Sequence, residues 1–207
     1  IGRLAGSALT TGANNVAIGL DPMDALTTGS LNIGIGKNAL GTATTGKNNV
    51  AIGELAMGTG VTIIGGGACG CNNIAIGKAA LTVMTTGSNN IGIGLTSADA
   101  LLTGTDNIAI GRSALAVSAD DADDNIAIGR LAMGVGDVSG ANNIALGNAT
   151  MDALTTGACN IAMGINALGA SQAGTYNIAM GKLALGAGNV DGNNNIAIGQ
   201  LALTAAT

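Results

Sequence analysis

Residues 72–88 read NNIAIGKAALTVMTTGS, and variants of this 17-residue unit fill the chain. Its first part is an Asn followed by Ile or Val, then Ala or Gly, then Ile, Leu or Met, and then Gly. This pattern occurs eleven times at spacings of 17 or 18 residues, with one spacing of 24. Self-similarity at a fixed period is typical of architectures in which each repeat contacts only its neighbours. Residues 1–207 are therefore predicted to be a single repeat array, and we expect the array to be a fragment of a longer chain.

The length and pattern of the unit predict the fold class. Two-helix repeats need about 33 residues or more, whereas alternation of Ile, Ala and Ile is typical of a short strand. Two glycine rows, which include Gly19 and Gly29, mark corners of the coil, and a second apolar row, which includes Met23 and Leu40, predicts a second strand. Stacked coils place equivalent strands about 4.8 Å apart in parallel. We predict an all-β parallel β-solenoid, a β-roll of about twelve coils of 17–18 residues.

One Asn in every repeat is predicted to stabilise a corner. Asn tolerates the left-handed backbone conformation, and its amide can bond the equivalent amides of adjacent coils as a ladder. A carboxylate at this position would repel its copies. The predicted structural ladder consists of Asn15, Asn32, Asn49, Asn73, Asn90, Asn107, Asn125, Asn143, Asn160, Asn177 and Asn195.

The middle residue of each predicted strand is Ala in nine repeats and Gly in two. If its neighbours, such as Val16 and Ile18, point into the coil, the middle residue points outward. A strand position that faces water would have gathered Thr, Ser, Lys or Glu, so we expect another copy of the chain to pack there. The predicted interface is Ala17, Ala51, Ala75, Ala109, Ala127, Ala145 and Ala179. The alternative is a thin coil whose two faces both pack against its own chain.

Composition argues against several classes of function. The chain has no His, Phe or Trp and one Tyr, and its net charge is −5. It therefore lacks the commonest general base and a usual metal ligand, and it lacks the basic patch and stacking platform of nucleic-acid-binding proteins. Asn and Gly interrupt every apolar run, so no stretch of about 20 apolar residues is available to cross a membrane. We expect no enzyme, no catalytic residue, no cofactor and no nucleic-acid partner.

The 24-residue spacing holds a seven-residue insertion around residues 61–71. Insertions in solenoids leave the rod as loops and often carry binding, and this one is apolar, so Val61, Ile63 and Ile64 form a candidate contact loop. Cys69 and Cys71 could bond within the loop or between chains, but we expect small buried thiols. Together with Cys159 they are too few for a disulfide framework or a four-ligand zinc site.

One acidic cluster, Asp120, Asp121, Asp123 and Asp124, surrounds Ala122, which replaces a corner Gly. Carboxylate oxygens this close together are a candidate Ca²⁺ site. A solvated loop is the favoured interpretation, because the glycine- and aspartate-rich repeat of calcium-binding β-rolls is absent.

Thr-Thr-Gly corners begin at Thr10, Thr27, Thr44, Thr85 and Thr155. Rows of Thr on a flat solenoid face suggest an ice-binding protein as an alternative function. Adjacent Thr residues point to opposite sides of the backbone, however, and this argues against a continuous Thr face.

The pattern N-x-[VI]-A-I-G-x-x-[AS] resembles the head repeats of trimeric autotransporter adhesins, and the longer unit, as in residues 80–90, resembles repeats of bacteriophage tail fibres. The resemblance extends over essentially the whole chain. It implies a left-handed β-roll in a homotrimeric fibre that extends lengthwise, found on a cell surface or as a virion tail fibre. The implied role is attachment to a host cell-surface receptor, with the tail fibre slightly favoured over the bacterial adhesin. The alternative is a single-chain solenoid that binds ice or another surface.

Overall fold

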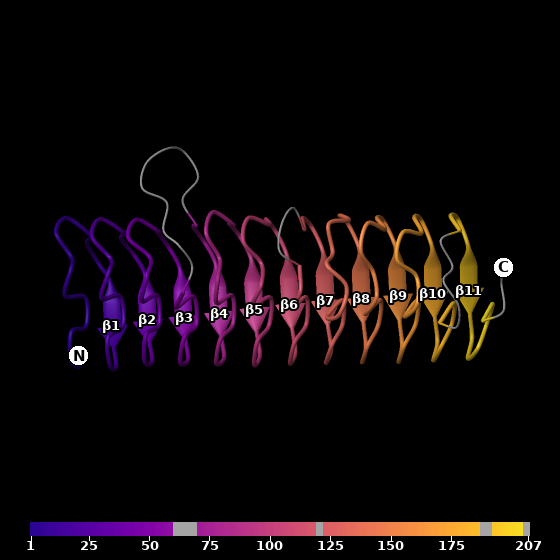
Figure 1. Cartoon of the computed structure of the whole chain (residues 1–207), viewed down its shortest axis with the longest axis horizontal. Coiled ribbons are helices and arrows are strands. Elements are labelled where there is room, and N and C mark those ends of the chain that lie inside the picture. The colour runs from indigo at the N-terminus through magenta and orange to yellow at the C-terminus, as the bar shows by residue number, and fades with distance from the viewer. Residues whose placement is uncertain (60–69, 119–121, 187–191, 205–207) are drawn as a thin grey trace.

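The computed structural model describes residues 1–59, 70–118, 122–186 and 192–204. These residues form a single row of stacked coils, with the first and the last strand at opposite ends of the row (Figure 1). Each coil contributes one strand of three residues to a common sheet. The strands are β1 (Val16–Ile18), β2 (Ile33–Ile35), β3 (Val50–Ile52), β4 (Ile74–Ile76), β5 (Ile91–Ile93), β6 (Ile108–Ile110), β7 (Ile126–Ile128), β8 (Ile144–Leu146), β9 (Ile161–Met163), β10 (Ile178–Met180) and β11 (Ile196–Ile198).

The sheet has 11 strands in sequence order, and every pair of neighbours is parallel. The register superposes equivalent positions of the repeat, so that Val16 lies opposite Ile33 and Ala109 lies opposite Ala127. The described part of the chain contains no helix. The predicted all-β parallel β-solenoid is therefore confirmed.

The prediction of a second strand in each coil is wrong. The row that includes Met23 and Leu40 lies in turns, and both residues have a φ of 53°. Two positions before Leu40, Asn38 has a φ of 54°. Residues with left-handed backbone conformation at every second position turn the chain repeatedly, and this is incompatible with an extended strand. The chain therefore curls tightly on this side of the coil and returns to the next strand within 17 residues, the distance from Val16 to Ile33.

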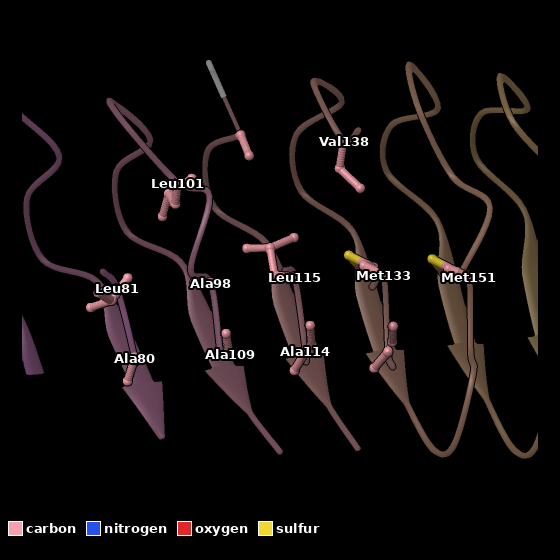
Figure 2. Close-up of a cluster of buried hydrophobic side chains, with 14 of the residues drawn as sticks. Ala80, Leu81, Ala98, Leu101, Ala109, Ala114, Leu115, Met133, Val138 and Met151 are labelled. Carbon is pink, nitrogen blue, oxygen red and sulfur yellow. The ribbon is translucent and has the colours of Figure 1, made fainter. Parts of the chain in front are cut away.

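The prediction of which strand face points inward is also wrong. The middle residues Ala51 and Ala75 are fully buried at 0% exposure, whereas Ile52 and Ile76 are 36% and 37% exposed. The reason is visible in Figure 2, where Ala109 lies in the buried cluster with Leu81, Leu115 and other members of the Leu and Met row. The large side chains that fill the coil come from its turn side, so only a methyl group or a hydrogen fits opposite them. The residues predicted as an interface, which are Ala17, Ala51, Ala75, Ala109, Ala127, Ala145 and Ala179, therefore pack against their own chain.

Candidate functional site: the outer face of the sheet

The outward face of the sheet is entirely apolar. It consists of the first and third residues of each of the 11 strands, all of which are Ile, Val, Leu or Met. We refer to these residues as the apolar strip. They are Val16, Ile18, Ile33, Ile35, Val50, Ile52, Ile74, Ile76, Ile91, Ile93, Ile108, Ile110, Ile126, Ile128, Ile144, Leu146, Ile161, Met163, Ile178, Met180, Ile196 and Ile198.

The size of the apolar strip follows from strand geometry. Eleven strands at about 4.8 Å spacing make it about 50 Å long, and three residues at about 3.3 Å make it about 10 Å wide. The flat area of roughly 500 Å² matches the largest apolar patches on ordinary monomers, which are often functional. A sheet face that meets water normally carries polar side chains, and here not one of the outward strand positions does. The apolar strip is therefore the strongest candidate for a binding surface on the described part of the chain.

Two further rows run along the long sides of the apolar strip. The row before the ladder Asn is rich in Asn and Asp, and we name it the amide edge: Asn14, Leu31, Asn48, Asn72, Asn89, Asp106, Asp124, Asn142, Cys159, Tyr176 and Asn194. The row after the corner Gly is rich in Lys and Arg, and we name it the basic edge: Leu20, Lys37, Glu54, Lys78, Leu95, Arg112, Arg130, Asn148, Ile165, Lys182 and Gln200. The two sides of the apolar strip thus differ in charge.

Few of the charges on the two edges are paired with other residues that the structure describes. Lys78 Nζ lies 3.1 Å from Glu54 Oε2 along the basic edge, and Arg3 pairs with Asp21 at 3.1 Å near the N-terminus. Ion pairs at the surface such as these contribute little to stability. Asp106, Asp124 and Arg112 form no ion pair in the part of the chain that the structure describes.

The ladder of Asn side chains is confirmed, and it lies inside the corner next to the amide edge. At each junction between coils the Oδ1 of one ladder Asn accepts the backbone N–H of the next, at 2.9–3.0 Å. At most junctions the side-chain amide of the second Asn also donates to the same oxygen, as from Asn90 Nδ2 to Asn73 Oδ1 at 3.2 Å. The same Nδ2 of Asn90 donates to the Gly104 carbonyl of the next coil at 2.7 Å. The nine ladder Asn residues from Asn32 to Asn177 are buried. The ladder therefore fixes the register of the coils by hydrogen bonds in the interior.

The left-handed residue of this corner is not the ladder Asn but the residue before it. Asn48 and Asn72 have φ values of 57° and 58°, and Leu31, Cys159 and Tyr176 adopt the same conformation at equivalent positions. The turn has to precede the ladder Asn, because the side chain of that residue must point into the coil to reach its neighbours. The sequence carried a signal for this turn, since Asn and Asp tolerate the left-handed region and occupy most positions of the amide edge.

The first Thr of the Thr-Thr-Gly corners ties adjacent coils together. Thr10 Oγ1 donates to the Thr27 carbonyl and Thr27 Oγ1 to the Thr44 carbonyl, both at 3.1 Å. Thr85 and Thr155 make the equivalent bonds to the carbonyls of Leu102 and Gln172. These hydroxyl groups therefore serve the stacking of the coils and are not directed to an external ligand.

Part of the candidate loop lies outside the described residues. Val61, Ile63, Ile64 and Cys69 belong to that segment. Cys71 is disulfide-bonded, so the expectation of a buried thiol is wrong at this position. Cys159 is a free, half-buried thiol on the amide edge.

The acidic cluster is also described only in part, because Asp120 and Asp121 lie outside the described residues. Asp123 Oδ1 accepts hydrogen bonds from the backbone N–H and the hydroxyl of Thr105 at 2.7 and 2.9 Å, so this carboxylate ties its coil to the preceding one. Asp124 is an exposed, left-handed member of the amide edge. No group of three or more His, Cys, Asp or Glu side chains that could hold a metal ion occurs among the described residues.

Comparison of the chain with family models, with curated proteins and with solved structures finds no match. In the described part of the chain, no helix is long and apolar enough to span a bilayer. The apolar strip and its two edges are therefore the features from which a function is inferred.

Proposed function

We propose that the chain is a segment of a non-enzymatic fibre, the shaft or head of a trimeric extracellular appendage, whose role is attachment to a cell or other surface. The observation that carries the proposal is the apolar strip, which runs without a polar residue along all 11 strands. A rod that keeps such a strip along its full length is suited to side-by-side association with identical rods.

The area of the apolar strip supports association between copies. Two strips of roughly 500 Å² bury about 1,000 Å² in total, which is the lower limit for a specific protein interface. The edge rows add to this area, because Leu20, Leu95 and Ile165 on the basic edge are 38%, 45% and 51% exposed. Identical rods also match each other in pitch, because both repeat at the spacing of parallel strands, about 4.8 Å. Side chains of facing strips can therefore interdigitate along their whole length.

The hydrogen bonds between coils support the proposal of a fibre shaft. The Asn ladder and the Thr hydroxyl bonds both run along the rod, from coil to coil. Bonds in this direction resist separation of the coils, as a shaft requires. The resemblance of the repeat to adhesin heads and tail fibres adds support for a trimer, for an extracellular or virion location, and for attachment to a receptor. The single-chain ice-binding alternative is not favoured, since the first Thr hydroxyls are bonded within the chain.

Sedimentation velocity of the chain over a hundredfold range of concentration tests the proposal. We expect one elongated species with about three times the 19.7 kDa mass of one chain. Electron microscopy of the same sample should show straight rods. A mass of two chains would contradict the trimer and keep the apolar strip as interface, whereas a 19.7 kDa monomer at all concentrations would contradict the proposal as a whole.

A further inference from the structure

We propose that the basic edge binds a linear acidic polysaccharide that carries a carboxylate in every second sugar ring, with the polymer lying along the rod. The inference goes beyond the proposed function, because it rests on the basic edge and not on the apolar strip. It therefore applies to a single rod as well as to an assembly. It follows from where the cations lie, how they are spaced and which groups lie beside them.

The cations of the chain are concentrated on the basic edge. Five of the seven Lys and Arg residues lie there, and all five are exposed. They are Lys37, Lys78, Arg112, Arg130 and Lys182. Glu54 is the one acidic residue of this edge, and from Lys78 to Lys182 the edge carries no carboxylate. The edge is therefore a positive line on a chain whose net charge is −5.

Acidic side chains of the same coils lie on other sides of the rod. Asp106 and Asp124 belong to the amide edge, across the apolar strip, whose three-residue strands make it about 10 Å wide. This width exceeds the Debye length of about 8 Å at physiological ionic strength. Asp99 and Asp152 lie in the turns, each directly after a buried residue. The acidic residues therefore weaken the attraction of the basic edge for an anion only slightly.

Most cations of the basic edge are available to an external anion. Lys37, Arg112 and Lys182 form no ion pair with any residue that the structure describes. Lys78 Nζ lies 3.1 Å from Glu54 Oε2. Arg130 makes one exposed bond of 3.3 Å to an Asn side chain. Exposed contacts of this kind are weak, so both side chains can exchange them for a carboxylate of a ligand.

The spacing of the cations matches a polymer with sparse charges. Lys37 follows β2, Lys78 follows β4 and Arg112 follows β6, and these strands belong to one sheet in sequence order. Strands at about 4.8 Å spacing place these cations about 10 Å apart along the rod. A sugar ring in an extended polysaccharide is about as long as the spacing between two adjacent coils. A carboxylate in every second ring therefore recurs at the spacing of these cations.

Polar groups suited to sugar hydroxyls lie next to the cations. The residues directly after the basic edge include Thr96, Ser113 and Asn166. The hydroxyl groups of Thr96 and Ser113 lie 3.0 Å apart, and Asn166 is exposed. Hydroxyl and amide groups both donate and accept hydrogen bonds, as sugar hydroxyls do. Ser113 adjoins Arg112, so one sugar unit can meet a cation and a hydroxyl group together.

Charge density favours such a polysaccharide over a nucleic acid. Duplex DNA carries one negative charge per about 1.7 Å of its axis, whereas the basic edge offers one cation per about 10 Å. The chain has no Phe, Trp or His, and its one Tyr, Tyr176, lies on the amide edge. Bases would therefore find no stacking partner beside the cations. A lipid bilayer spreads its charges over a plane, whereas these cations lie along one line.

Binding of fluorescent hyaluronan oligosaccharides, which carry one carboxylate per two rings, tests the inference by fluorescence anisotropy. We expect saturable binding that weakens at least about tenfold between about 0.05 M and 0.3 M sodium chloride, because salt screens exposed charges. Uncharged dextran should not bind. The absence of hyaluronan binding would overturn the inference. Binding of duplex DNA or of phosphatidylglycerol vesicles at least as tight as that of hyaluronan would also overturn it.

Two single substitutions in the same repeat distinguish the basic edge from net charge. Lys37→Gln and Lys47→Gln each remove one exposed positive charge, but only Lys37 lies on the basic edge. We expect Lys37→Gln to raise the dissociation constant for hyaluronan about threefold and Lys47→Gln to leave it unchanged. Lys37→Gln with Arg112→Gln and Lys182→Gln should raise it more than about tenfold. Equal losses in the two single variants would overturn the inference.

Removal of the acidic residue from the basic edge provides a test by gain of affinity. Glu54→Gln frees Lys78 from its ion pair and should lower the dissociation constant about threefold. An unchanged or higher constant would contradict the basic edge as the binding site. Sedimentation of the same samples separates this inference from the proposed function. A 19.7 kDa monomer that binds hyaluronan would contradict the trimer and support this inference, whereas an assembled chain that does not bind would overturn this inference alone.

Discussion

Oδ1 of Asn107 accepts the backbone N–H of Asn125, 18 residues later, at 3.0 Å. Both residues are buried, with 1% and 0% exposure. The side chain of Asn107 also donates from Nδ2 to Asn90 Oδ1 at 3.0 Å and to the Ala122 carbonyl. One side chain thus satisfies polar groups in the coils on either side of it, and none of its partners can reach water instead.

Asn107→Ala should lower the free energy of unfolding by about 2–6 kcal/mol. The change leaves the N–H of Asn125 and the carbonyl of Ala122 without this partner in the interior, and each unsatisfied buried group costs about 1–3 kcal/mol. Denaturant unfolding followed by circular dichroism measures the difference. Asn148→Ala is the control, because Asn148 on the basic edge accepts a single 3.3 Å bond from Arg130 at an exposed site, and it should change stability by less than about 0.5 kcal/mol. Equal losses in the two variants would contradict an internal ladder.

Gly111→Ala should destabilise the chain by more than about 2 kcal/mol. Gly111 has a φ of 132°, and a Cβ there would lie 2.5 Å from the Gly129 carbonyl oxygen of the next coil. This backbone region is strained by about 1–3 kcal/mol for any other residue, and backbone atoms cannot move aside without breaking the stack. Thermal melting measures the effect.

Gly41→Ala is the matched control for this change. Its φ lies outside the left-handed region, and its nearest neighbour would be the Asn38 carbonyl oxygen at 3.1 Å. We expect a change of less than about 1 kcal/mol. If Gly41→Ala melted at a temperature as low as Gly111→Ala, the loss of stability would come from steric crowding in general and not from the positive φ at the corner glycine.

Asp152→Asn should raise stability at neutral pH and leave it nearly unchanged in acid. Burial raises the pKa of the Asp152 carboxyl above 3.8, against smaller opposing effects of hydrogen bonds from its own backbone N–H and that of Ala153. The folded chain therefore binds this proton more tightly than the unfolded chain, so the free energy of unfolding falls as pH rises from about 4 through the folded-state pKa. The amide cannot ionise and avoids this loss. Unfolding at pH 3.5 and pH 7 checks the prediction, and an equal gain at both would contradict it.

The repeat was sufficient to predict the solenoid. A 17-residue period with two glycine corners is too short for a two-helix repeat and is typical of a coil with a short strand. The faces of the strand could not be assigned in the same way. Alternation shows that Ala109 and Ile110 point to opposite sides, but both are apolar, so hydrophobicity does not show which side is inward. The deciding factor is the space opposite the strand, and Leu81, Leu115 and their equivalents fill it from left-handed turns.

Glycine shows the consequence of this packing most clearly. A Cβ placed on Gly92 would come within 2.9 Å of Leu81 Cγ in the preceding coil. The small residues at this strand position are thus explained by the chain's own interior, and a second chain is not needed to account for them. The surface suited to association was therefore visible only once the turn side of the coil was known.

Two lysine variants of β7 test the central claim. The claim is that the middle Ala of each strand packs inside the coil, whereas the flanking Ile residues form the contact between chains. Ala127→Lys places a charge in the closed interior, where Ala127 is 0% exposed, and should abolish the β-sheet signal in circular dichroism. Ile126→Lys with Ile128→Lys places charges on the apolar strip and should leave a folded chain with a sharp melting transition and a light-scattering mass of 19.7 kDa. An Ala127→Lys chain that keeps the parent melting temperature while its mass falls, or an Ile126→Lys and Ile128→Lys chain that stays assembled, would contradict the account.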